Sequence, residues 1–461
     1  MKPIRKYPSM SVSSWNDLIF GTCKYPLKYG FGLKVGSGEV VPEIKYFPKR
    51  NGETDQRSLK AEYEGITRNV LKRAVDLGLP SIQLDTEQTF IITKNPKLGG
   101  EITNLQKSIM EEYVNEYGLS CALRVTVADI RELGGEMRGG GEIGLMLDSF
   151  DQAAGNGADV LSIESIGGKE VFNYSVIRQD IEGALFSVGV LGSLDMEFLW
   201  RAIVQIAGRY GIVAGGDTDC AHGNTAMILA DGFTGKMISH TFAATVRAMG
   251  AARSLVAYEQ GATGPGKDCG YENVIIKAIT GLPMSMEGKS SASAHSSLVG
   301  NVAAAACDLW SNEQVENVML YGGWAPQVFT EILGYDTALM NAAIKANFQM
   351  QLRDLFVKAG PFDPQVLVLS PEGAWRIGDA IVKNSSDYYS RSREAALEAL
   401  KVIEDGYEKS GRNLAPMEVR TLKKLGEMMN GAPNSYEAFV EKNLRIYKSR
   451  VGNFSPSNYG L

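Results

Sequence analysis

The sequence predicts an α/β protein that folds as a (β/α)₈ barrel with an N-terminal extension and a helical C-terminal tail. From residue 80 onward, short apolar runs alternate with longer amphipathic segments. The short runs are rich in β-branched residues and apolar at consecutive positions, as expected of parallel strands covered on both faces. A barrel also accommodates most of a 461-residue chain, because barrels routinely exceed the usual domain size. An open, doubly wound sheet is the alternative that this pattern leaves.

The barrel is predicted to span residues 81–392. Two of its helical segments are 105–118 and 196–211, and Gly211 at the end of the second is a plausible C-cap. The strands are eight short runs, at 81–85, 121–127, 159–164, 184–190, 212–216, 254–259, 318–321 and 366–370.

The two ends of the chain do not fit the repeat. Residues 1–80 are predicted to wrap the barrel as an N-terminal extension. Residues 393–461 are predicted to form a helical tail, with helices at 393–411, 417–431 and 435–452.

The composition excludes several classes of protein. A hydrophobic content of 44% and a charged content of 22% are ordinary for a globular protein with a sizeable core. The net charge of −6, without a basic run, argues against a nucleic-acid partner. Neither a secretion signal nor an apolar stretch of about 18 residues occurs, so no membrane association is expected. Five cysteines, an odd number, indicate a reduced, cytoplasmic protein instead of a disulfide framework.

Reactive side chains follow three of the predicted strands, where barrels place their active sites. Glu164 ends the third strand, Cys220 follows the fifth and Cys269 follows the sixth. Cys220 lies 56 residues after Glu164, and Cys269 lies 49 residues after Cys220, so only the fold can bring them together. Two thiolates and a carboxylate suit zinc, and three protein ligands leave a position for substrate.

Buried packing is the alternative for every cysteine, since free cysteine is commonly a small buried hydrophobe. We favour packing for Cys23, Cys121 and Cys307. Cys220 and Cys269 stand in polar, glycine-rich loops, where packing explains little, and the residues alone leave both interpretations open.

The remaining polar candidates are weaker. His222, two residues after Cys220, can bind a metal, orient a ligand or carry a proton. We expect His240 and His295 to be structural. Asp217, Asp219 and Asp268 flank the cysteines and can support the site or simply form turns.

Two glycine-rich segments resemble phosphate-binding motifs. GATGPGKD (261–268) matches GxxxxGK, but Asp268 stands where Ser or Thr should bind magnesium. GGGEIG (139–144) matches GxGxxG, but it lies about a dozen residues beyond its strand. We interpret both as barrel loops, and the loop 134–144 and the N-terminal extension are candidates for contacts with another subunit.

Three motifs together carry a family resemblance: LSIES with Glu164, GGDTDCAHGNT with Cys220, and GPGKDCGYEN with Cys269. They resemble those of the zinc-containing, methanol-activating subunit of methanol:corrinoid methyltransferases, and the likeness extends over essentially the whole chain. The resemblance implies a TIM barrel with one zinc ion per chain bound by Glu164, Cys220 and Cys269. His222 is then expected to support the site without binding the metal.

The resemblance also implies a reaction and a partner. The methyl group of methanol passes to the cob(I)alamin-type cofactor of a separate corrinoid protein, giving methyl-Co(III) and water. Family members form heterotetramers with two copies of each subunit and serve methanol-dependent methanogenesis in the cytoplasm. This chain has no DxHxxG signature for cobalamin, so its partner must supply the corrinoid.

Two other classes of function remain open at this stage. One is another zinc barrel enzyme, a hydrolase or an aldolase, although those favour histidine ligands and this chain has only three histidines. The other is a non-catalytic subunit that docks a corrinoid protein around a structural metal.

Overall fold

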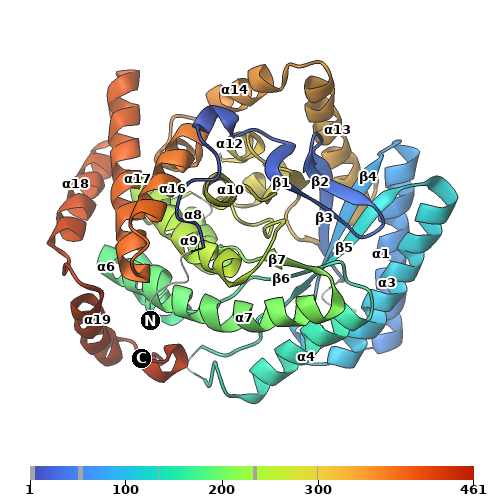
Figure 1. Cartoon of the computed structure of the whole chain (residues 1–461), viewed down its shortest axis with the longest axis horizontal. Coiled ribbons are helices and arrows are strands. Elements are labelled where there is room, and N and C mark those ends of the chain that lie inside the picture. Colours follow the sequence, from blue (N-terminus) through green and yellow to red (C-terminus); the bar gives the residue numbers. More distant parts are fainter. Residues whose placement is uncertain (1–5, 50–54, 134, 232–235, 298) are drawn as a thin grey trace.

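Parallel strands form the wall of a closed barrel in the computed structural model, which describes residues 6–49, 55–133, 135–231, 236–297 and 299–461 (Figure 1). Seven strands follow one another in chain order, and the last pairs with the first. Residues 263–266 fill the remaining gap, because Thr263 N donates to Ala214 O at 2.9 Å and Gly266 bridges to Met284. The predicted (β/α)₈ barrel is confirmed, with an irregular segment as its sixth stave. The strands are β3 (Val41–Phe47), β4 (Ser81–Glu87), β5 (Ser120–Val127), β6 (Val160–Ile163), β7 (Val213–Gly216), β8 (Ser285–Glu287) and β9 (Leu309–Ser311).

Four predicted strands match barrel strands, and the other four do not. Residues 184–190, 254–259 and 366–370 are helical, and 318–321 belongs to the separate hairpin of β11 (Met319–Leu320) and β12 (Gly323–Trp324). A short apolar run cannot distinguish a buried strand from a buried helical segment. Residues 254–259 show why, because they lie in a helix whose residues 241–259 are all buried.

The N-terminal 80 residues contribute to the barrel itself, which corrects the predicted boundary at residue 80. They contain β3, the strand that closes the barrel, and the helix α1 (Gln56–Asp76). The hairpin of β1 (Thr22–Tyr29) and β2 (Leu33–Ser37) forms a separate sheet outside the wall. Phe31 N in its turn donates to Cys121 O at the start of β5, so the hairpin covers the amino-terminal ends of the strands.

Helices surround the wall in one layer, and a second layer covers part of it (Figure 1). In the inner layer, successive helices from α1 to α10 contact each other in space, α13 packs against α1, and α14 (Gln349–Ala359) contacts both α12 and α13. The second layer contains α15 (Pro364–Leu369), α17 (Tyr388–Ser410) and α18 (Pro416–Gly431), which pack on α9 and bury it. The inner helices are α1, α3 (Pro96–Tyr117), α4 (Gly141–Gly155), α7 (Ser193–Tyr210), α9 (His240–Gln260), α10 (Asn273–Thr280), α12 (Gly300–Ala304) and α13 (Ala325–Lys345).

The predicted helical tail is confirmed as α17 (Tyr388–Ser410), α18 (Pro416–Gly431) and α19 (Tyr436–Arg450). The C-cap at Gly211 is also confirmed, since this residue adopts the left-handed conformation with φ 66°. The remaining short elements are α2 (Phe90–Thr93), α5 (Lys169–Val176), α6 (Ile181–Ala184), α8 (Thr225–Ala230), α11 (Lys289–Ala294), α14 (Gln349–Ala359), α15 (Pro364–Leu369), α16 (Pro371–Lys383) and β10 (Val315–Glu316).

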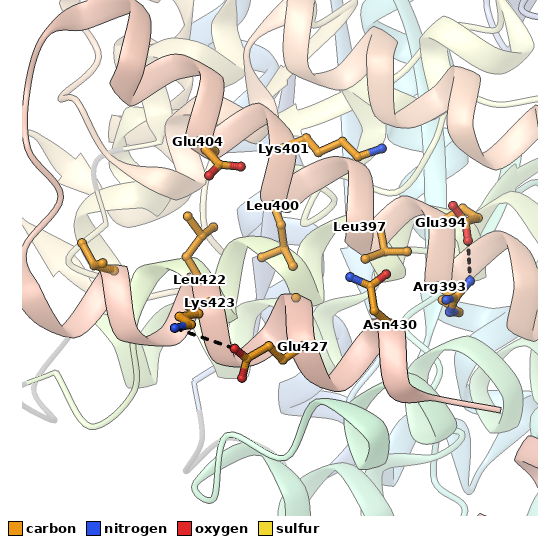
Figure 2. Close-up of a pocket in the computed structure, with 12 residues that line it drawn as sticks. Arg393, Glu394, Leu397, Leu400, Lys401, Glu404, Leu422, Lys423, Glu427 and Asn430 are labelled. Carbon is orange, nitrogen blue, oxygen red and sulfur yellow. Dashed lines mark hydrogen bonds and ion pairs between the residues drawn. The ribbon is translucent and has the colours of Figure 1, made fainter. Parts of the chain in front are cut away.

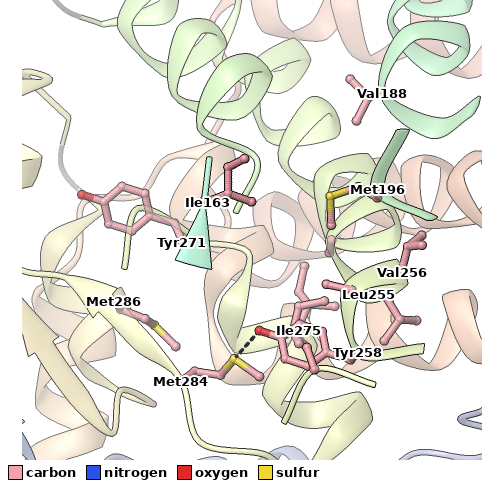
Figure 3. Close-up of a cluster of buried hydrophobic side chains, with 14 of the residues drawn as sticks. Ile163, Val188, Met196, Leu255, Val256, Tyr258, Tyr271, Ile275, Met284 and Met286 are labelled. Atoms are coloured by element: carbon pink, nitrogen blue, oxygen red, sulfur yellow. Dashed lines mark hydrogen bonds between the residues drawn. The ribbon is translucent and has the colours of Figure 1, made fainter. Parts of the chain in front are cut away.

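One continuous helical stretch, Ile181–Tyr210, is long and apolar enough to cross a membrane by composition alone. Its most apolar window is 94% buried inside the protein, which makes it a core helix. Figure 3 shows Val188 and Met196 of this stretch beside a core cluster that also contains Tyr258 of α9 and Met284. The hydroxyl of Tyr258 lies 3.5 Å from Met284 Sδ and connects α9 to the start of β8.

The inside of the barrel is polar above an apolar base. At the base, Leu33 and Val35 of the hairpin pack with Val41 and Leu309. Above them, Glu43 of β3 accepts a hydrogen bond from the Arg124 guanidinium at 2.7 Å, and both side chains are fully buried. Buried charges of this kind require partners, so each inward side chain at this level depends on the others.

We expect Arg391→Met to lower the free energy of unfolding by about 3–5 kcal/mol, because it leaves a buried charge without its partner. Arg391 of α17 donates to both carboxylate oxygens of Glu259 in α9, at 3.0 and 2.9 Å. Both side chains are almost fully buried. Urea unfolding measures the loss. Arg209→Met is the control, since its exposed pair with Asp151 contributes at most about 1 kcal/mol. Equal urea midpoints for the two variants would contradict this assignment.

Candidate metal centre

The three predicted ligands meet at the carboxyl ends of the strands. Glu164 directly follows β6, Cys220 begins the short helical turn Cys220–Asn224 after β7, and Cys269 follows the irregular stave. Their ligand atoms all lie within 4.8 Å of one another. Cys269 Sγ is 2.7 Å from Glu164 Oε1, with the sulfur as donor. The fold therefore brings together groups that are more than 100 residues apart in the sequence.

Buried hydrogen bonds hold the loops that carry these ligands. Asp217 Oδ2 accepts from Ser165 Oγ at 2.7 Å and from Trp200 Nε1 at 3.1 Å, which ties the loop after β7 to the residue beside Glu164. Gly250 of α9 allows this loop to approach closely, because a Cβ there would lie 2.4 Å from Asp219 Oδ2. Asp217 and Asp219 thus act as supports of the loop.

Two buried lysines lie beside the ligands. Lys45 of β3 places its Nζ 2.8 Å from Cys269 Sγ and 3.3 Å from Glu164 Oε1. Lys267 places its Nζ 2.8 Å from both Asp85 and Glu87, and it also pairs with Asp268. The lysine of the GxxxxGK segment is therefore surrounded by carboxylates, a setting that repels phosphate.

The charges in this cluster are unbalanced. Its carboxylates are those of Asp85, Glu87, Glu164, Asp268 and Glu287, all in contact with Lys45 or Lys267. Five carboxylates face two ammonium groups, so negative charge is in excess even before the thiols ionise. Burial and repulsion by Glu313 raise the pKa of Glu287 to about 7. Excess negative charge beside two thiols favours a cation.

Protonation of the ligands follows the same electrostatics. Burial raises the pKa of Glu164, but the charges of Lys45 and Lys267 outweigh it and lower the pKa to about 2. Burial, the neighbouring Cys220 thiol and the Glu164 carboxylate raise the pKa of Cys269 well above its usual value. Because metals bind thiolates, a metal that binds here must displace thiol protons, and its affinity falls as the pH falls.

The donor set fits zinc. A carboxylate and two thiols are established zinc ligands, and three protein ligands leave one position open. Other acidic groupings occur nearby in the described part of the chain, such as Glu287 with His295 and Glu313, but this one contains both cysteines. Cys121 and Cys307 lie buried in the apolar core, and Cys23 lies half-buried outside this cluster.

His222 is fully buried and lies outside the ligand grouping. Its Nδ1 is 2.5 Å from Asp219 Oδ1, and its ring packs edge-on against Phe172 at 4.9 Å between centroids. Nε2 has no hydrogen-bond partner among the described residues. Burial lowers the pKa of His222 despite the nearby Asp219 charge, so the ring is neutral at physiological pH. These contacts fix the turn that begins with Cys220.

An open cavity of about 620 Å³ leads to the cluster from the carboxyl ends of the strands. Glu87 and Glu164 line it, and so do the apolar side chains of Phe47, Phe90 and Ile91. Phe90 and Ile91 are 62% and 47% exposed, which is unusual for such large apolar side chains. The entrance of the cavity is therefore suited to contact an apolar surface of another molecule.

A cavity of about 710 Å³ elsewhere carries no comparable chemistry. It lies between α17 and α18 and is lined mainly by leucines and charged side chains (Figure 2). Two of its ion pairs, Arg393 with Glu394 and Lys423 with Glu427, join neighbours on one helix. Its lining contains neither cysteine nor histidine.

The sequence interpretation missed both lysines and most of the carboxylates. Lys45 lies within residues 1–80, whose sequence pattern predicts an extension and not a barrel strand. The alternation of Glu43 and Lys45 in VPEIKYF was a usable signal, since it places two charged side chains on one face of a strand. Glu287 lies in a strand of three residues, which is too short to recognise from its pattern.

Comparisons with known proteins identify the family of this chain. A family model described as the methanol-cobalamin methyltransferase B subunit matches residues 4–460. The chain is 45% identical over 460 residues to the methanol–corrinoid protein co-methyltransferase of Methanosarcina barkeri (strain Fusaro / DSM 804), with 99% of both chains covered. It also matches a crystal structure of the methanol:cobalamin methyltransferase complex MtaBC from Methanosarcina barkeri, with a TM-score of 0.96, 45% identity and 99% of each chain covered. The chain belongs to the methanol-cobalamin methyltransferase B subunit family.

Proposed function

We propose that this chain transfers the methyl group of methanol to the cobalt of a corrinoid carried by a separate protein. Zinc, held by Glu164, Cys220 and Cys269, is the proposed metal. The observation that carries the proposal is the convergence of these three residues beside an open cavity that Glu164 lines. The names of the two relatives, which specify methanol, cobalamin and a corrinoid protein, support the substrate and the partner.

The reaction breaks the C–O bond of methanol and forms a cobalt–carbon bond. Co(I) supplies both electrons and becomes Co(III), while the oxygen takes up one proton and leaves as water. Zinc, when bound, supplies Lewis acidity that polarises the C–O bond. The protein holds the alcohol oxygen at the ligand cluster, so the methyl group faces the cavity from which the cobalt must approach. Glu164 supplies an oxygen ligand in the place where a third cysteine would supply sulfur. This harder donor suits a substrate that binds the metal through its oxygen.

Removing and restoring the metal tests this proposal. We expect about one zinc per chain, loss of methanol-dependent methylation of a Co(I) corrinoid after chelation, and recovery when zinc is added back. Zinc affinity should fall as the pH falls, because protons compete for the two thiols. Elemental analysis and absorbance of the methylated corrinoid measure these results. A protein that binds zinc but never methylates the corrinoid would instead be a docking subunit.

We propose that His222 supports the metal site without binding the metal. Its hydrogen bond to Asp219 and its contact with Phe172 position the turn that starts at Cys220. We expect a zinc-loaded crystal structure to place both ring nitrogens beyond bonding distance of the metal. A zinc–nitrogen distance of about 2.1 Å would contradict this role.

A further inference from the structure

We propose that Lys45 is a positioning residue of the metal site, because its ammonium group donates hydrogen bonds to the ligands Cys269 and Glu164. These hydrogen bonds hold both ligands in place and withdraw electron density from the sulfur, which strengthens the Lewis acidity of the metal. The inference rests on the proposed function and adds a group that acts on the metal through its ligands.

The position of Lys45 is closely defined. Its Nζ lies 2.8 Å from Cys269 Sγ and 3.3 Å from Glu164 Oε1, and its side chain is 2% exposed. Asn312 accepts from Lys45 N at 3.0 Å and donates to Lys45 O at 2.9 Å, which clamps the backbone of the strand. A hydrogen bond from a charged donor is stronger than a neutral one, and burial strengthens it further.

More acceptors surround Lys45 than it has protons. Besides the two ligands, Glu87, Asp268 and Glu287 lie within 3.4 Å of its Nζ. An ammonium group can donate only three hydrogen bonds at a time, so the five acceptors share its protons. The contact with the sulfur therefore belongs to a fixed network that spans the bottom of the site.

Lys267 provides an internal comparison. It is equally buried and contacts the same cluster through Asp85, Glu87 and Asp268. It forms an ion pair of 3.5 Å with Glu164 Oε1, and no hydrogen bond joins it to Cys220 or Cys269 in the described structure. Lys267 thus supplies charge to the cluster, whereas Lys45 supplies charge and a hydrogen bond to the sulfur.

This difference separates a positioning role from a merely structural one. A thiolate that loses a hydrogen bond donates more charge to its metal, and the site around it becomes more negative. Loss of Lys45 should therefore leave zinc bound at least as tightly while methyl transfer becomes slower. A lysine that only maintained the fold would lose metal affinity and activity together.

The test compares Lys45→Met with Lys267→Met in the full chain loaded with Co²⁺ in place of zinc. We expect the sulfur-to-cobalt charge-transfer band of Lys45→Met to shift to lower energy, and that of Lys267→Met to stay at the wild-type position. With zinc, chelator competition should give Lys45→Met an affinity no weaker than wild type. Its methyl transfer to the corrinoid protein should fall about 10–100-fold, as for other groups that orient metal ligands.

Lys45→Gln is the second variant, to be used if Lys45→Met does not fold. The amide is a weaker, neutral donor, so the band should shift in the same direction by a smaller amount. Coincident bands for wild type and both Lys45 variants would overturn the proposal, and so would an equal shift in Lys267→Met. If wild type itself lacks the sulfur band or does not methylate a corrinoid, the proposed function fails instead.

Discussion

Replacing Cys269 by alanine should remove most of the bound zinc and nearly all methyl transfer, while the barrel still folds. Groups that merely orient a metal ligand contribute about 10–100-fold to metal affinity or to activity, and a ligand itself must contribute more. Cys269→Ala also leaves Lys45 and Glu164 without their sulfur partner. Cys220→Ala should have the same effect on zinc and on activity.

Elemental analysis, a methylation assay and circular dichroism check this expectation. Cys121→Ala is the matched control, because Cys121 is also fully buried but lies at the amino-terminal end of β5, far from the site. It should retain its zinc. Full zinc occupancy in both Cys220→Ala and Cys269→Ala would show that the metal is held elsewhere.

Methyl transfer should be at least about 100-fold faster to a cognate corrinoid protein than to free cob(I)alamin at equal concentration. A docked partner fixes the cobalt above the methyl group, and such positioning is among the largest contributions to rate. We expect the partner to dock on the rim of the cavity, where Phe90 and Ile91 are exposed. The β1–β2 hairpin lies at the other end of the barrel, so this part of the predicted extension does not contribute to the rim.

A pair of phenylalanine variants tests the docking surface. Phe90→Ser should lower the rate of methyl transfer to the corrinoid protein but leave the zinc content unchanged. Phe348→Ser is its control, since Phe348 is 61% exposed but does not line the cavity. Native mass spectrometry of the complex should also show two copies of each subunit. Equal rates with free and protein-bound corrinoid would contradict delivery by a partner.

The barrel and the cluster of Glu164, Cys220 and Cys269 could be predicted because their signals are local. Glu164 ends an apolar strand, and both cysteines stand in glycine-rich loops where a core thiol is unexpected. Three of the four wrong strand assignments failed because burial removed the difference between helix and strand, whereas 318–321 belongs to an exposed hairpin. Residues 254–259 are apolar because the second layer of helices covers α9 from outside, which a short window of sequence does not reveal.

The charged surroundings of the site could not be predicted for a different reason. Lys45 and Glu43 lie on a strand that faces a polar interior, so their strand lacks the apolar run expected of a barrel stave. Their partners, such as Arg124 and Glu287, lie between 81 and 242 residues further along the chain. Such pairs become visible only when the fold has placed the strands side by side.

The closure of the barrel by β3 and β9 sets the order of events during synthesis. Val41 pairs with Leu309, so the first stave leaves the ribosome long before its final neighbour exists. At about 5–20 residues per second, β3 waits on the order of 10–50 s with one edge unpaired. Inward charges such as Glu43 and Lys45 discourage that edge from joining other chains. We expect metal loading to follow release of residue 269, because no shorter nascent chain contains all three proposed ligands.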